Sequence, residues 1–287
     1  MAKPLANVAA SVRQRLLDLA RREQRTFEVV LVAFGLERLI HRLAVSSYRD
    51  KFVLKGGMLV TLWTADPGRF TRDVDFLGFA QADQDKLAAA FAEILSIEIA
   101  DGLIFDVARI EAALIREDQI YGGVRLKTTA FLEKTRIPIT IDVGFGDALG
   151  DPAYQIEYVS LLEFEPVRIR AYSPATVIAE KFQAVIALGA ANSRMKDYYD
   201  LWAIPKSIAI DPAELARTIK ATFERRSTEI PTDRPEGLSS LFSANPAKAA
   251  QWAAYSEATV LEGVSLTDVV NEIWRRLLPI CEIARNT

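Results

Sequence analysis

The sequence has a single cysteine, a single histidine and no long hydrophobic run among its 287 residues. Because Cys281 is alone, no disulfide can form within the chain, which is typical of proteins in a reducing compartment. His41 lies among apolar residues of a predicted helix, and we interpret it as structural. The sequence therefore argues against zinc sites of the usual His/Cys type and against Ser-His-Asp triads. Acid–base or metal chemistry is expected from carboxylates, lysine, tyrosine or arginine.

Membrane and export signals are also missing. No apolar run reaches the roughly 20 residues that a membrane helix needs, and residues 1–24 have no apolar signal core. We therefore expect a soluble, cytoplasmic protein with no membrane partner. The net charge of -3 argues against a general nucleic-acid coat. It leaves room for a local basic groove, although Arg13–Arg15, Arg21–Glu23 and Arg225–Arg226 are each more typical of a solvated helix face.

The hydrophobic pattern predicts an α+β protein in three parts. Residues 1–50 are expected to form N-terminal helices, 51–170 a core with a small mixed sheet, and 171–287 a helical C-terminal domain. Within the last part, Ser173 followed by Pro174 predicts a helix start, and Gly189 predicts its end. The proline-bearing segment 226–246 is expected to be a loop.

Two aspartates stand either side of a valine in the predicted strand "RDVDFLGF". Residues two apart on a strand point to the same face, so the carboxylates of Asp73 and Asp75 should converge. A divalent cation would relieve their repulsion, and Mg²⁺ prefers one or two carboxylates together with substrate phosphates. The alternative is a polar strand edge that faces solvent.

A third carboxylate strengthens the metal prediction. Asp142 follows the apolar run of the strand "RIPITIDVGFGD", and Asp147 in the glycine-rich turn is the alternative. Three carboxylates on two strands can hold a pair of Mg²⁺ ions about 4 Å apart for in-line nucleotidyl displacement.

Two adjacent glycines precede a predicted helix in "KFVLKGGMLVTL". A glycine turn at a helix start leaves backbone N–H groups free to bind phosphate, and a side chain would block that approach. Tight turns also use such pairs. Near the two aspartates, Gly56 and Gly57 favour a phosphate site.

Lys181 falls inside the apolar arc of its predicted helix. Its ammonium could extend to the rim of that face or enter a cleft that binds triphosphate. Asp197 and Asp200 are three residues apart on the next helix, so they lie on one face. They could pair with Lys181 or Arg194, or shape the site.

With these motifs together, the chain resembles the AbiEii/AbiGii toxin family of nucleotidyltransferases, which includes the MenT toxins. The matching segments are "LKGGMLVTL", "RFTRDVDF" and "AEKFQAVIALGAANSRMKDYYDL". The resemblance implies a polymerase-β-like nucleotidyltransferase core whose substrates are an NTP and an acceptor such as a tRNA 3′ end. It also implies a cognate antitoxin as a partner.

The resemblance also implies roles for individual residues. Gly56 and Gly57 would contact phosphate, and Asp73 and Asp75 would bind metal. Lys181, Asp197 and Asp200 would form the nucleotide site. Catalytic roles are expected for Asp73, Asp75, Lys181 and Asp200. The use of Asp142 as a metal ligand is an inference from the strand and not from the family. The family often has serine or threonine after the glycines, whereas this chain has Met58.

Two function classes follow from the sequence. The first is a Mg²⁺-dependent nucleotidyltransferase whose acceptor is an RNA, with a protein or small-molecule acceptor as a variant. The second is a nucleotide-binding regulatory protein without turnover, which the missing hydroxyl at Met58 keeps open.

Overall fold

The computed structural model describes residues 7–78, 83–115, 122–147, 149–257 and 259–287. The chain divides into two compact units, and neither is one continuous stretch. The first comprises residues 1–59, 70–146 and 155–171, and the second comprises 60–69, 147–154 and 172–287. Each unit is described by itself below.

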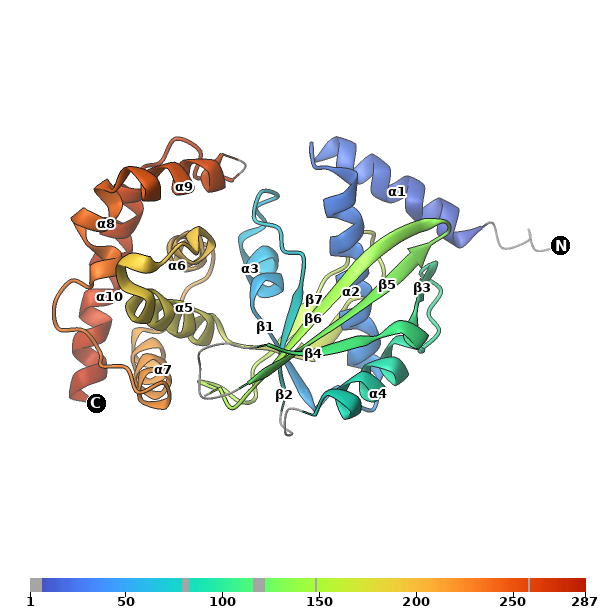
Figure 1. The fold of residues 1–287 in the computed structure, drawn as a ribbon, viewed down its shortest axis with the longest axis horizontal. Helices are drawn as coiled ribbons and strands as arrows, with labels where there is room; N and C mark the ends of the chain where they lie inside the picture. Colours follow the sequence, from blue (N-terminus) through green and yellow to red (C-terminus); the bar gives the residue numbers. More distant parts are fainter. Residues whose placement is uncertain (1–6, 79–82, 116–121, 148, 258) are drawn as a thin grey trace. The chain divides into compact units, whose positions relative to one another are not determined.

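The first unit combines helices with both sheets of the protein (Figure 1). Its helices are α1 (Val8–Arg22), α2 (Phe27–Val45) and α4 (Gln84–Leu95), with a 3₁₀ turn at Val107–Arg109 and the start of α3 (Gly57–Thr64). Its strands are β1 (Phe52–Lys55), β2 (Val74–Gly78), β3 (Leu103–Phe105), β4 (Glu111–Ile115), β5 (Gly123–Leu132), β6 (Thr135–Phe145), β7 (Gln155–Tyr158) and β8 (Val167–Arg170).

The larger sheet is mixed. Among the described residues it has the strand order β1-β2-β6-β5-β3, with β4 also paired to β5. Among the strand pairs of the described residues in this sheet, β2 and β6 alone run parallel to each other, and β5 and β6 form the long hairpin that is prominent in Figure 1. The parallel pair brings two strands that are distant in the sequence side by side, and both carry a predicted carboxylate.

One face of this sheet packs against α2. Ile137, Ile139 and Ile141 of β6 are each 1% exposed, and they alternate with more exposed residues. Gly35 of α2 comes so close that a Cβ at this position would lie 2.9 Å from Ile139 Cδ1. Since strand side chains alternate between faces, Asp142 lies on the face away from α2.

The second unit is helical. It contains α5 (Pro174–Leu188), α6 (Met195–Ser207), α7 (Pro212–Arg225), α8 (Ser240–Ala244), α9 (Pro246–Ser256) and α10 (Leu266–Asn286), with 3₁₀ turns at Gly189–Ala191 and Glu236–Leu238. Capping explains several of the helix starts. The side chain of Ser173 accepts a hydrogen bond from Thr176 N and is followed by Pro174, while Asp211 caps α7 in the same way.

The predicted α+β class, with a small mixed sheet and a helical C-terminal part, is confirmed. The predicted helix between Ser173 and Gly189 is also confirmed. The loop predicted for 226–246 is wrong at Glu236–Leu238 and at α8, because Ser239 caps a short helix there. The division into three parts stays a prediction. Contacts between residues group the N-terminal helices with the sheet in one unit.

None of the helices formed by the described residues is long and apolar enough to cross a membrane.

Candidate functional site

Four charged residues form a row across the sheet of the first unit. The strand register places Lys55 of β1 beside Asp75 of β2. It places Asp75 beside Asp142 of β6, and Asp142 beside Arg125 of β5. Residues opposite each other on neighbouring strands point to the same face. The row therefore lies on the face away from α2, with two carboxylates in the middle and one cation at each end.

The glycine pair adjoins this row. Gly56 has a φ of +71°, and a Cβ at this position would lie 2.0 Å from Asp75 Oδ2. A side chain at Gly56 is therefore excluded both by the backbone conformation and by the aspartate. A Cβ at Gly57, which begins α3, would lie 2.8 Å from Thr71 Oγ1. The backbone that the sequence assigns to phosphate is thus in contact with the carboxylate that it assigns to metal.

Asp73 lies just before β2 and is oriented by its own neighbour. Thr71 Oγ1 donates a hydrogen bond of 2.6 Å to Asp73 Oδ1. Met58 is 4% exposed, so this side chain belongs to the core of the protein. A hydroxyl still lies beside the glycine pair, because Thr71 Oγ1 is close to Gly57.

Asp142 is bound by an arginine. Its Oδ1 accepts a hydrogen bond of 2.8 Å from Arg125 Nε, and its Oδ2 accepts one of 2.6 Å from Arg125 Nη2. The hydrogen bond with Asp142 raises the pKa of Arg125 above its ordinary value, burial opposes the rise, and the charges of Asp142, Asp73 and Asp75 add to it. Both motif aspartates therefore lie close enough to Arg125 to act on its charge.

The carboxylates Asp73 and Asp75 fit a divalent cation that is bound together with a substrate. No group of three His, Cys, Asp or Glu residues in the described parts of the chain could hold a metal ion by itself. Magnesium is usually held by one or two carboxylates, with substrate phosphates and waters completing its octahedron. Two carboxylates beside the glycine turn that is predicted to bind phosphate match that mode. Asp142 as a further ligand stays a prediction, and such a role would require its pair with Arg125 to open.

The second unit holds a buried, charge-balanced network. Lys181 Nζ lies 2.8 Å from Asp197 Oδ1 and 2.7 Å from Asp200 Oδ2. Arg69 donates two hydrogen bonds to the same Asp200, from Nε to Oδ1 at 2.6 Å and from Nη2 to Oδ2 at 2.8 Å. Side-chain exposure is 13% for Lys181, 6% for Asp197 and 0% for Asp200. Two cations therefore balance two carboxylates, as buried charges require.

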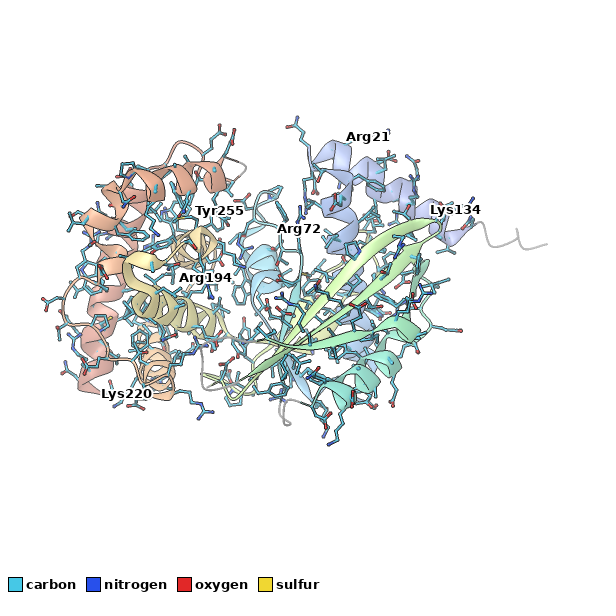
Figure 2. All side chains as sticks on the ribbon, in the orientation of Figure 1. Arg21, Arg72, Lys134, Arg194, Lys220 and Tyr255 are labelled. Atoms are coloured by element: carbon cyan, nitrogen blue, oxygen red, sulfur yellow. The ribbon has the colours of Figure 1, made fainter. Side chains whose placement is uncertain are left out.

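This network keeps Lys181 charged. Burial lowers the pKa of its ammonium, but Asp197 and Asp200 outweigh burial, and the net pKa lies above its ordinary value. Arg194, the alternative partner considered for the aspartates, is exposed at the N-cap of α6 (Figure 2). Of the two partners that the sequence left open for the aspartates, the structure pairs them with Lys181, whereas the catalytic roles stay predictions.

Asp147 lies in the second unit rather than in the sheet. Its Oδ1 is 3.3 Å from Arg226 Nη2, and its Oδ2 accepts a hydrogen bond of 2.9 Å from the Tyr172 hydroxyl. Arg226 also contacts Glu180 at 2.8 Å. Arg226 is thus paired with two carboxylates of its own unit, and its position needs no RNA phosphate as a partner.

Comparisons with known proteins identify the family of this chain. The family described as "Nucleotidyl transferase AbiEii toxin, Type IV TA system" matches residues 38–271, which is most of the chain. The chain belongs to the AbiEii family of nucleotidyltransferase toxins. It is accordingly a nucleotidyltransferase, of a toxin family from toxin–antitoxin systems.

Solved structures resemble this AbiEii-family protein in fold. One is MenT4, a nucleotidyltransferase toxin from Mycobacterium tuberculosis H37Rv, with a TM-score of 0.54, 19% identity, and coverage of 98% of this chain and 99% of that chain. Another is JHP933 from Helicobacter pylori, with a TM-score of 0.46, 17% identity, and coverage of 88% and 90%. At 19% identity, the likeness to MenT4 shows the fold alone. No curated protein matches the sequence.

In this AbiEii-family protein, sequence reasoning found Lys181 but missed the cations Lys55, Arg69 and Arg125. Lys55 and Arg125 flank the carboxylates, but their neighbours follow from strand register, which a single sequence does not reveal. Arg69 and Thr71 were visible only as letters of the "RFTRDVDF" motif. The structure gives each a partner, Asp200 for the arginine and Asp73 for the threonine.

Proposed function

We propose that this protein transfers a nucleoside monophosphate from an NTP to the 3′ end of an RNA, with tRNA as the acceptor class and Mg²⁺ as the metal. In this reaction the acceptor hydroxyl oxygen bonds to the α-phosphorus, and the bond to pyrophosphate breaks. The observation that carries the proposal is the contact between Gly56 and the Asp75 carboxylate. With phosphate held at this turn and a metal ion at Asp75, one triphosphate would reach both.

Each group of residues has a role in this proposal. Gly56 and Gly57 hold phosphate oxygens through the backbone, since their lack of side chains permits close approach. Asp73 and Asp75 hold the divalent ion, which when bound polarises the phosphate and offsets developing charge. Lys181, which stays protonated, contributes positive charge to the nucleotide site. Asp197 and Asp200 fix its ammonium.

The cellular role belongs to the same proposal. Membership of a toxin family implies an NTP substrate and a cognate antitoxin. Modification of RNA in the cytoplasm would make the protein toxic, and the antitoxin would counter it. Production of the protein in bacterial cells is expected to stop growth, whereas the Asp75→Ala variant should not.

The direct test incubates the pure protein with Mg²⁺, total tRNA and each α-labelled NTP in turn. Asp75→Ala removes the proposed metal ligand, and Asp85→Ala removes an exposed carboxylate of α4 as the matched control. Label should reach RNA with the wild type and the control only. Full transfer by a folded Asp75→Ala variant would overturn the proposal.

The same experiment separates the other function classes. NTP that binds without labelling RNA would point to a protein or small-molecule acceptor, or to binding without turnover. Label on added protein or small molecules would decide between these.

A further inference from the structure

The row of charges on the sheet contains a cation that no expectation from the sequence uses. Arg125 of β5 is directly opposite Asp142 of β6, and Asp142 is beside Asp75 on β2. Two interstrand spacings separate the backbones of Arg125 and Asp75, about 10 Å. A guanidinium on a long side chain can cover much of that distance. Arg125 therefore lies beside the place where a triphosphate would meet Asp75.

The pairing with Asp142 fixes the guanidinium without using all of it. Asp142 takes Nε and Nη2, which form one edge of the planar group. Arginine has five N–H donors, so three remain after these two bonds, and Nη1 and Nη2 form a second edge. The side chain of Arg125 is 42% exposed, whereas that of Asp142 is 14% exposed. Asp142 is thus the less exposed partner that holds the guanidinium, and the more exposed Arg125 keeps donors for a ligand.

The charge of the row favours the same arrangement. A triphosphate is strongly anionic and has to be bound near Asp73, Asp75 and Asp142. Asp142 without a cation would add to the repulsion, whereas Asp142 paired with Arg125 does not. Arginine suits this position because its fork matches carboxylate on one edge and phosphate on another.

We propose that Arg125 binds the phosphate groups of the nucleotide, and that Asp142 is a positioning residue that orients Arg125 rather than a third metal ligand. This inference rests on the proposed function, because it needs an NTP at the carboxylates. In this arrangement Asp73 and Asp75 hold the metal ion, and the guanidinium of Arg125 is the protein's own cation for the phosphates.

The test compares Arg125→Met, Arg125→Lys, Asp142→Asn and the double variant Arg125→Met/Asp142→Asn. Arg136→Met is the matched control, because Arg136 is an exposed arginine on the same face of β6, six residues from Asp142. Two binding constants are measured on protein whose thermal unfolding shows that it is folded. One is for Mn²⁺ without nucleotide, by electron paramagnetic resonance. The other is for a non-hydrolysable NTP with Mg²⁺, by calorimetry.

The Arg125 substitutions should weaken nucleotide binding by roughly ten- to a hundredfold, since bonds to a charged group are lost. Arg125→Lys should recover only part of this, because an ammonium cannot bind carboxylate and phosphate through two edges. Asp142→Asn should weaken the nucleotide and leave Mn²⁺ affinity within about threefold, and the double variant should be no worse than Arg125→Met alone.

Other results would overturn the inference. If Asp142→Asn weakens Mn²⁺ binding about tenfold or more while Arg125→Met leaves the nucleotide unaffected, Asp142 is a metal ligand. If both constants are unchanged in all folded variants, the pair only stabilises the sheet. A wild type that binds the nucleotide without transferring it would refute the proposed reaction and leave these two constants to decide on Arg125. A wild type that binds no nucleotide would refute both.

Discussion

Gly56 is the residue at which the requirements of the backbone and of the site coincide. Its φ of +71° lies in the left-handed region, and its missing Cβ leaves room for Asp75, whose Oδ2 lies 2.0 Å from the position that a Cβ would take. A side chain here would have to displace the aspartate, because the aspartate side chain moves more easily than the sheet backbone. The position of the Asp75 carboxylate, which is the proposed metal ligand, therefore depends on the absence of one methyl group.

Replacement of Gly56 by alanine should cost more activity than stability. The left-handed backbone would cost about 1–2 kcal/mol. Displacement of Asp75 by about 1 Å should lower transfer about a hundredfold. Urea unfolding and initial transfer rates measure the two effects.

Gly263→Ala is the matched control for this substitution. Gly263 has a φ of +78°, but nothing lies within 4 Å of the position of its Cβ. The control should lose similar stability and keep its activity. Equal activity losses in the two variants would show that backbone strain, and not Asp75, is responsible.

Lys181 offers a second prediction at this scale. Its ammonium carries positive charge that Asp197 and Asp200 stabilise, as its raised pKa indicates. Lys181→Ala should therefore reduce transfer on the order of a hundredfold or more, and it should destabilise the protein because two buried carboxylates then share one cation. Lys196→Ala, which removes an exposed ammonium from α6, is the control. A loss of activity below about threefold in folded Lys181→Ala would limit the lysine to a structural role.

The anionic residues of the site could be predicted from the sequence, but most of its cations could not. Asp73, Asp75 and Asp142 are conspicuous because carboxylates beside apolar strands are costly without a partner. Arg125 is an ordinary arginine in the sequence, and it becomes informative only when the register places it opposite Asp142. A single sequence therefore indicates site residues that would be costly to bury without a partner. It does not indicate residues whose contacts arise only from the pairing of distant strands.

Elements with strong terminal signals were predicted best. The helix α5 has Ser173 and Pro174 at its start and Gly189 at its end, and the structure keeps all three roles. The strands β7 and β8 have four residues each, and such short segments carry little periodicity. Helix α8 lies among prolines and serines whose composition favours a loop, yet Ser239 acts as its N-cap.

Helix α2 contains the single histidine of the chain, which makes a clean pH prediction possible. Burial lowers the pKa of His41, and the charge of Arg38 adds to this, while Asp101 opposes it. Within the described residues, His41 Nδ1 is buried without a hydrogen-bond partner. Protonation is therefore easier in the unfolded chain than in the folded protein.

The sign of the effect follows from linkage. Below the ordinary histidine pKa of about 6.5, the unfolded chain binds the proton first, so the free energy of unfolding should fall as the pH falls. Urea unfolding at a series of pH values between about 7.5 and 5 measures the slope, and His41→Gln should reduce it. The same slope in the wild type and in His41→Gln would assign it to groups other than His41. Glu37 is not among them, because burial raises its pKa and gives a slope of the opposite sign.

At the scale of the whole molecule, the two units are interleaved along the chain. Residues 60–69 and 147–154 belong to the helical unit, although both are flanked by segments of the sheet unit. Each inserted segment brings one member of an ion pair, Arg69 for Asp200 and Asp147 for Arg226. The predicted boundary near residue 171 follows composition, which cannot show that part of the helical unit is encoded before the sheet is complete.

The interleaving predicts how a C-terminal fragment should behave. Residues 172–287 by themselves lack Arg69, so the buried Asp197 and Asp200 would share Lys181 alone. In the whole chain, Asp200→Asn breaks a balanced network and should cost about 3 kcal/mol. In the fragment, the same substitution removes the unbalanced charge and should be stabilising. Urea unfolding followed by circular dichroism measures both effects, and a loss of stability in both contexts would show that Arg69 does not balance this network.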